Sequence, residues 1–385
     1  MSIADPRPGH TPSGAADDAA LPGAVLLQQP MRLAAVLSPL LTDVDARLVD
    51  SRVSIQRYVP GKRCSFELEL VIAPGGADSV EVRTVIGKLY AGGEGARAYD
   101  TLHRLWASGF SNGPFTVPRP LAYEPEWQLL LLSRVTGTAL RQLLLATPAL
   151  VADGRRKVEG GSGPPSPAVH LPPSAEVSTA VERAAEWLMK LHTSGVTGRR
   201  WYTFDRHLHT LAHWQRRVVH VYPEATDPFS ALLARIEAQG RALPAWEPAP
   251  THRDFSPDHI VIDGMRLSGL DFDEFCQYDP LFDVAHFVAH LRLLGLTSSA
   301  TPALQDRIEA LSHPSERVMV QPFDELATRF QMAYEAHAKE YSAARVRLYE
   351  AITYLKLAHI IACITRPHSW QQSVATLLGE AQKIV

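Results

Sequence analysis

Strand-type and helix-type patterns occupy separate parts of this 385-residue chain. Between Val53 and Ser133, short apolar runs alternate with polar residues and are separated by turn signals, which is the period of half-buried strands. From Ala175 onward, apolar residues such as Val181 and Leu188 recur at helical spacing. Runs of strands followed by runs of helices are typical of α+β folds. The sequence therefore predicts a small antiparallel sheet followed by a larger, mostly helical part.

The predicted sheet has five strands and one main helix. Three strands form a meander, with the turn Pro60-Gly61-Lys62-Arg63 after the first, and Lys88 stands near the end of the third. Gly92-Gly93 ends that strand, and a helix follows at 94–108. The strands are expected at 53–59, 65–72, 79–90, 115–121 and 127–133.

These patterns divide the chain into three parts. Residues 1–28 are expected to be a disordered tail, because Ala, Pro, Gly and Asp dominate there without periodicity. Residues 29–134 are expected to form a sheet-containing N-lobe, and residues 135–385 a helical C-lobe. Within the C-lobe, the Gly/Pro/Ser-rich stretch 153–174 predicts a mobile surface insertion, more readily a plain linker than a substrate lid.

Composition excludes several classes of function. A formal net charge of -3 argues against a general nucleic-acid or membrane-surface binder. The apolar runs, such as 127–132, are strand-length, so no membrane span is expected, and the start of the chain has no cationic or apolar signal pattern. Three cysteines, Cys64, Cys276 and Cys363, lie far apart and follow no metal-binding spacing. A reduced, cytoplasmic protein is the expectation.

The segment from Thr251 to Asp283 carries the most specific signal. It contains the triplet His252-Arg253-Asp254, a short apolar hairpin at 259–270, and the acidic cluster Asp271-Phe272-Asp273-Glu274. Two carboxylates on either side of a hairpin are what a metal-dependent phosphoryl transfer requires.

The order of these motifs resembles the aminoglycoside phosphotransferase and choline kinase family from about 53 to 341. In that family the catalytic loop reads His-x-Asp, and a metal-binding Asp follows a short strand. The corresponding residues are His252 with Asp254, the segment 270–273, Asp279-Pro280, and the Leu191-His192 pair that ends a helix. The resemblance implies a bilobal protein-kinase-like fold and phosphorylation of small-molecule hydroxyls.

The resemblance assigns roles to the two central carboxylates. Asp254 would accept or orient the proton of the attacking hydroxyl, and Asp271 would bind Mg²⁺ through its oxygens. A loop-capping Asp and a solvated turn acid are the structural alternatives. Asp273 and Glu274 either reach metal or substrate or lie on the surface.

ATP would be bound by the N-lobe. Lys88 would hold the α- and β-phosphates, with Glu94 in the first turn of the helix as its partner. An edge-strand charge is the alternative for Lys88. The resemblance further implies a phosphate-covering hairpin and an interlobe hinge whose backbone groups read the adenine. The residues concerned are Gly61, Lys62 and Arg63 in the hairpin and Ser133, Arg134 and Val135 in the hinge.

The catalytic loop departs from the family at one position, where His259 replaces an Asn. Imidazole offers Mg²⁺ a nitrogen instead of an amide oxygen. It either ligates the metal, hydrogen-bonds a metal-bound water, or marks a lost second metal site. His252 is expected to be structural and Arg253 to lie on the surface or brace the loop. Asp279 and Asp283 either brace the loop or line the acceptor site.

The sequence thus predicts an ATP- and Mg²⁺-dependent kinase acting on a hydroxyl of an aminoglycoside-, choline- or sugar-like acceptor. A cationic acceptor is one reading of the acidic cluster, although metal–phosphate sites need the same acids. The alternative is a nucleotide-binding pseudokinase or regulatory module without turnover, and His259 is the residue on which the two differ. A protein kinase is disfavoured, because no glycine-rich loop or activation segment is present.

Overall fold

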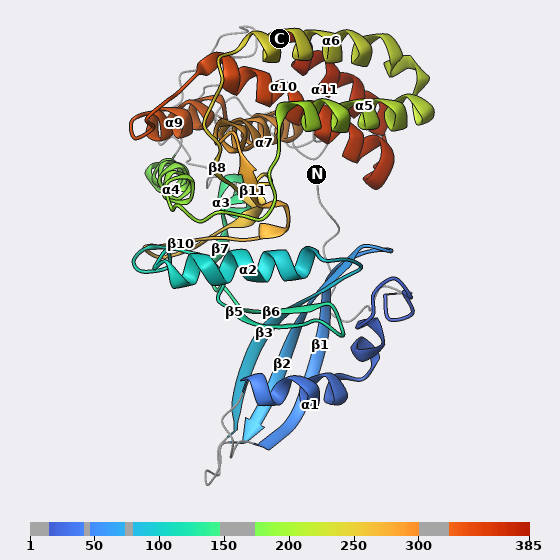
Figure 1. Ribbon diagram of the computed structural model, residues 1–385, viewed down its shortest axis with the longest axis vertical. Helices are drawn as coiled ribbons and strands as arrows, with labels where there is room; N and C mark the ends of the chain where they lie inside the picture. The colour runs from blue at the N-terminus through green and yellow to red at the C-terminus, as the bar shows by residue number, and fades with distance from the viewer. Residues whose placement is uncertain (1–14, 42–46, 74–79, 147–173, 300–322) are drawn as a thin grey trace, which may run out of the picture. The chain divides into compact units, whose positions relative to one another are not determined.

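The computed structural model describes residues 15–41, 47–73, 80–146, 174–299 and 323–385 (Figure 1). They form two compact units, each described by itself. Unit 1 comprises Met1–Gly137, Val196–Arg199 and Asp263–Phe275. Unit 2 comprises Thr138–Gly195, Arg200–Ile262 and Cys276–Val385. The segment 263–275, expected within the C-lobe, therefore belongs to the same unit as the N-terminal sheet.

Unit 1 is built on a five-stranded antiparallel sheet with the strand order β1-β2-β3-β6-β5 (Figure 1). Alternation of apolar and polar residues places every second side chain of a strand on the same face. In β2 this alternation is complete, since residues 64, 66, 68, 70 and 72 are all buried. The strands are β1 (Arg47–Val59), β2 (Arg63–Ala73), β3 (Glu81–Tyr90), β5 (Pro120–Glu124) and β6 (Leu129–Ser133).

One face of the sheet is covered by the N-terminal segments η1 (Ala24–Gln28) and α1 (Pro30–Leu41). Leu26 and Leu33 are buried there with Phe66, Leu68 and Val85. The expected disordered tail therefore differs from the structure over residues 15–28, because their leucines complete this core. The first 14 residues of that predicted tail lie outside the described part of the chain.

A parallel strand pair adds a late segment to unit 1. Strand β4 (Phe115–Thr116) pairs with β10 (Arg266–Gly269), and the Thr116 and Ser268 hydroxyls lie 2.9 Å apart. After β10 the chain enters the short helix η4 (Phe272–Glu274), which contacts helix α2 (Glu94–Ala107). The acidic cluster is thereby joined to the N-terminal sheet.

Unit 2 is mostly helical, as predicted. Two small antiparallel ladders, β7 with β9 and β8 with β11, flank the catalytic-loop sequence. Residues 153–173 of the predicted insertion lie outside the described residues. Its elements are β7 (Thr138–Ala139), α3 (Leu140–Leu145), α4 (Ala175–His192), α5 (Phe204–Val221), η2 (Pro223–Ala225), α6 (Thr226–Ala242), β8 (Ala249–Thr251), η3 (Pro257–His259), β9 (Ile260–Asp263), β11 (Cys276–Tyr278), α7 (Leu281–Ser299), α9 (Phe323–Glu335), α10 (Ala343–Ile360), η5 (Ile361–Thr365) and α11 (Trp370–Ile384).

Helix α10 is the central helix of unit 2 and contacts α5, α6, α7 and α11. With η5 it forms the segment Ala343–Thr365, which is long and apolar enough to cross a membrane. That corrects the expectation that no segment has this length. Of its most apolar window, 72% is buried inside the structure, as in a helix that is apolar all round because it lies in a protein core.

Gly87 in β3 is required by close packing with its cross-strand partner Phe66. A Cβ at this position would lie 2.2 Å from the Phe66 ring. We expect Gly87→Ala to lower the free energy of unfolding by about 1–3 kcal/mol, the usual cost of overpacking a core. Urea unfolding monitored by circular dichroism measures the change.

The matched control is Gly379→Ala in α11, where an added Cβ meets nothing within 4 Å. This change should leave stability unchanged or raise it, by up to about 1 kcal/mol, because alanine favours the helix. Equal unfolding free energies for Gly87→Ala and the parent chain would contradict the predicted clash.

Candidate active site

The His252-Arg253-Asp254 loop of unit 2 is held by a buried carboxylate. Asp283, in the first turn of α7, accepts hydrogen bonds from the backbone N–H groups of His252 and Arg253, both at 2.7 Å. The Nε2 atom of His192 lies 3.1 Å from the same carboxylate. Of the two roles considered for Asp283, its contacts are those of a residue that braces the loop. The ring of His252 is buried, and its Nδ1 accepts from the Asp254 N–H at 3.3 Å.

Arg253 is buried and takes a left-handed backbone conformation, with φ of 65°. Its guanidinium lies 3.5 Å from the centroid of the Tyr202 ring. Such a cation–π contact stabilises a desolvated arginine, and a non-glycine residue at positive φ is held there by its surroundings. Burial excludes the surface alternative, so Arg253 braces the loop.

Asp254 is held by a residue that the sequence patterns did not reveal. Lys356, on α10, donates to the Asp254 carboxylate at 2.7 Å. Burial alone would raise the pKa of Asp254, but the positive charge of Lys356 holds it well below its usual range. Asp254 is therefore ionised at neutral pH, as a proton acceptor must be.

His286 on α7 completes this cluster. Its Nδ1 donates to the carbonyl oxygen of Phe255 at 3.0 Å, so Nε2 accepts from Lys356 at 3.0 Å. Burial and the nearby Lys356 charge lower the pKa of His286 well below its ordinary value. A neutral His286 thus fixes the Lys356 ammonium against Asp254.

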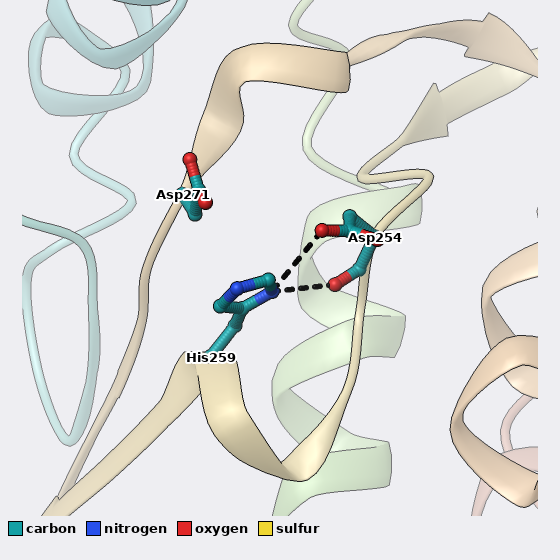
Figure 2. Close-up of side chains that lie close together, drawn as sticks. All are labelled: Asp254, His259 and Asp271. Atoms are coloured by element: carbon teal, nitrogen blue, oxygen red, sulfur yellow. Dashed lines mark hydrogen bonds and ion pairs between the residues drawn. The ribbon is translucent and has the colours of Figure 1, made fainter. Parts of the chain in front are cut away.

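His259, at the end of η3, lies beside Asp254 (Figure 2). Its Nδ1 lies 2.7 Å from the Asp254 carbonyl oxygen and 3.6 Å from the carboxylate. If Nδ1 donates to that carbonyl, the neutral ring carries its lone pair on Nε2. Metal-bound histidines are commonly oriented in this way, so the geometry suits a ligand or a partner of a metal-bound water.

Unit 1 contains a second cluster, in which cationic side chains surround Asp271 and Asp273. Lys88 lies 2.7 Å from Asp271 and 3.3 Å from Asp273. Tyr90 donates to Asp273 at 2.7 Å, and Arg63 forms an ion pair with the same carboxylate. Burial would lower the pKa of Lys88, but the two aspartates raise it, so the ammonium stays charged. Asp271 also has a positive φ, of 65°.

Glu94 is not the partner of Lys88, and that prediction is wrong. It forms an ion pair with Arg97 at 3.4 Å, and about half of its side chain is exposed. The sequence identified the nearest acid along the chain, whereas the pairing of β4 with β10 brings Asp271 to the lysine. Tyr90 was not anticipated as a partner of the cluster either.

The remaining predicted residues of unit 1 lie on or near the surface. Lys62 and Glu274 are exposed, and the Gly61 N–H donates to Asp18 at 2.7 Å. In the predicted hinge, Ser133 accepts from the Arg119 N–H at 2.9 Å. Arg134 pairs with Glu67 at 3.3 Å, and Val135 is half-buried.

Asp279 of unit 2 is fully buried. It accepts hydrogen bonds from Tyr349 and from the Leu281 N–H, both at 3.0 Å, and pairs with Arg345 at 3.3 Å. These contacts are structural, so of the two roles considered for Asp279 the structure favours bracing.

Comparisons with known proteins agree with the resemblance to phosphotransferases that the sequence motifs indicate. Residues 161–317, which include both motifs, match the model of the phosphotransferase enzyme family. The choline kinase LicA from Streptococcus pneumoniae has 11% identity and a TM-score of 0.50, covering 92% of this chain and 98% of its own. A thermostable mutant of the aminoglycoside phosphotransferase APH(4)-Ia, in a ternary complex with AMP-PNP and hygromycin B, has 14% identity and a TM-score of 0.51. That match covers 88% of this chain and 93% of the mutant.

None of the curated proteins compared matches the sequence. The predicted resemblance is confirmed by the family match, and the predicted protein-kinase-like fold by the structural likeness. The prediction of a phosphotransferase is confirmed by that family match.

We expect Asp283→Ala to lower the free energy of unfolding by about 2–4 kcal/mol, because two buried N–H groups and His192 lose their acceptor. Asp283→Asn should cost less, since one amide oxygen still accepts. Asp324→Ala is the control, because that side chain is 91% exposed and its ion pair contributes little. Thermal and urea unfolding compare the three variants, and equal losses for Asp283→Ala and Asp324→Ala would refute the bracing role.

Proposed function

We propose that this phosphotransferase moves the γ-phosphoryl group of ATP to a hydroxyl of a small molecule. The observation that carries the proposal is the family match over 161–317, which includes Asp254, His259 and Asp271. An adenine-nucleotide donor is supported by the AMP-PNP in the hygromycin-bound structure and by a second structure of LicA in complex with AMP, at a TM-score of 0.51.

In the proposed reaction, Asp254 accepts the proton of the acceptor hydroxyl. The hydroxyl oxygen forms a bond to the γ-phosphorus, the bond from that phosphorus to the β–γ bridging oxygen breaks, and ADP leaves. Asp254 fits this role because Lys356 keeps it ionised and Asp283 holds the loop that carries it. The proton that the hydroxyl loses is thus taken up by this carboxylate.

Asp271 is proposed to bind Mg²⁺, because its carboxylate offers the hard oxygens that this ion prefers. When bound, the ion neutralises charge on the nucleotide phosphates. His259 is proposed as its neighbour in the metal shell, through Nε2 or through a metal-bound water. The fit is supported by the Nδ1 contact with the Asp254 carbonyl, which favours a lone pair on Nε2.

Lys88 and Arg63 are proposed to bind the nucleotide phosphates, and the backbone at 133–135 to read the adenine. The proposal for the two cations is supported by their charge and by their place beside Asp271 and Asp273 in unit 1. Nucleotide phosphates would replace aspartate oxygens with other anionic oxygens around the same ammonium and guanidinium groups. We also propose that the protein is located in the cytoplasm.

Removing either central carboxylate is expected to separate chemistry from binding. Asp254→Asn should lower kcat about 10²–10⁴-fold, the usual contribution of a positioned base, while ATP binding persists. Asp271→Asn should weaken the Mg²⁺-dependent stabilisation by ATP. ADP release and thermal shift with ATP and Mg²⁺ measure the two effects. Asp227→Asn, at an exposed position of α6, is the control.

Binding of ATP without ADP release, unchanged by Asp254→Asn, would favour the pseudokinase alternative. Loss of ATP binding in Asp254→Asn but not in Asp271→Asn would contradict the two assigned roles. Equal turnover in Asp227→Asn and the parent chain would show that the losses of activity in the other two variants are specific.

His259 is expected to make the Mg²⁺ site weaker than an asparagine would. Imidazole offers a softer nitrogen where an amide offers the hard oxygen that Mg²⁺ prefers. The Mg²⁺ concentration for half-maximal activity should therefore be lower in His259→Asn than in the parent chain, and ADP release titrated with Mg²⁺ measures the difference. Identical Mg²⁺ requirements for the two proteins would exclude His259 from the metal shell.

A further inference from the structure

Lys356 changes the charge of the site in which the acceptor hydroxyl would react. Its ammonium lies 2.7 Å from Asp254 and 3.0 Å from His286, and one fifth of its side chain is exposed. Since His286 is neutral, Asp254 and Lys356 together carry no net charge. A base without such a partner would present a full negative charge to its substrate.

The other acids near the loop in unit 2 are also held by hydrogen-bond donors or cations. Asp283 accepts from two loop N–H groups and His192, and Asp279 pairs with Arg345. Asp258 pairs with Arg141 at 3.4 Å. Among the described residues of unit 2, the acids around the catalytic loop are thus already matched by donors or cations from their own unit.

An amine-bearing acceptor would gain little at such a site. Its ammonium would lose hydration without meeting an uncompensated carboxylate. Its attraction to Asp254 would be offset by repulsion from Lys356, because the two opposite charges lie only 2.7 Å apart. The uncompensated loss of hydration reduces binding by roughly 10-fold or more. Neutral hydroxyls do not meet this penalty, and an anionic group can contact the partly exposed ammonium of Lys356.

We propose that Lys356 sets acceptor specificity, so that the enzyme phosphorylates neutral or anionic hydroxyl compounds, such as sugars and hydroxy acids, in preference to amino-bearing ones. The inference rests on the proposed function and narrows it. It also replaces the interpretation that the acidic cluster attracts cationic acceptors, because Asp271 and Asp273 are paired with Lys88 and Arg63. Lys356 acts on the acceptor by its charge, and on Asp254 as a positioning residue.

The test uses the full chain and matched triplets of acceptors that differ in charge. Glucose, glucuronate and glucosamine form one triplet, and glycerol, glycerate and serinol form another. Each compound is tested for ADP release, and also for competition with uncoupled ATP hydrolysis, in which water is the acceptor. We expect the amino member of each triplet to have a kcat/KM, or a competing affinity, at least about 10-fold below that of its neutral counterpart.

Variants at Lys356 test the cause of this selectivity. Lys356→Met removes the charge and should reduce the discrimination against the amino member about 10-fold, mainly through KM or the competing affinity. Lys356→Arg keeps the charge and should keep the discrimination. Lys383→Met is the control, because that exposed lysine of α11 pairs only with Glu380 among the contacts described. Thermal unfolding verifies that each variant is folded.

The outcomes separate the inference from the proposed function. Uncoupled hydrolysis abolished by Asp254→Asn supports the function whatever the acceptor, and hydrolysis unaffected by it overturns both. An amino member that reacts or competes as well as its neutral counterpart overturns the charge selection while the function stands. Unchanged discrimination in a folded Lys356→Met does so too. Should that variant not fold, the parent chain's own ratios within the triplets decide.

Discussion

The buried carboxylate of Asp283 is the constraint on which the catalytic loop of unit 2 depends. Its acceptor oxygens fix the N–H groups of His252 and Arg253, which leaves Arg253 with a positive φ that an isolated peptide would avoid. The chain then turns so that the Asp254 carboxylate accepts a hydrogen bond from Lys356 and the His259 ring lies against the Asp254 carbonyl. A single buried charge thus determines the conformation of a loop whose reactive groups are only partly buried.

Local patterns were sufficient to predict much of the fold. Complete alternation in β2, and helical stripes such as that of α4, report which face each element buries, and neither depends on distant residues. The segments His252-Arg253-Asp254 and Asp271-Phe272-Asp273 could also be recognised in the sequence, because their chemistry needs fixed residue types at fixed spacing. The tail was misjudged, because the few leucines between Leu21 and Leu33 are too widely spaced to show a period, yet they close the core of the sheet.

Contacts between distant segments could not be predicted. Lys356 is separated from Asp254 by 102 residues and lies on a helix that is otherwise almost wholly buried. Nothing in the local sequence of α10 distinguishes a lysine that reaches a carboxylate from one that reaches solvent. The partner of Lys88 was missed for the same reason, since the strand pairing that brings Asp271 near joins residues 152 positions apart.

Both motif carboxylates are compensated by a cation from another part of the fold: Asp254 by Lys356 in unit 2, and Asp271 by Lys88 in unit 1. The two compensations have different consequences for function. Around Lys88, nucleotide phosphates are themselves anions and can take over from the aspartates, so the pairing holds the cation where it is used. At Asp254 no anion needs to replace the carboxylate, and Lys356 can stay in place during the reaction. The same ion pair that keeps the base ionised therefore also removes the negative potential that would hold a cationic acceptor, which links the activation of this base to the choice of its substrate.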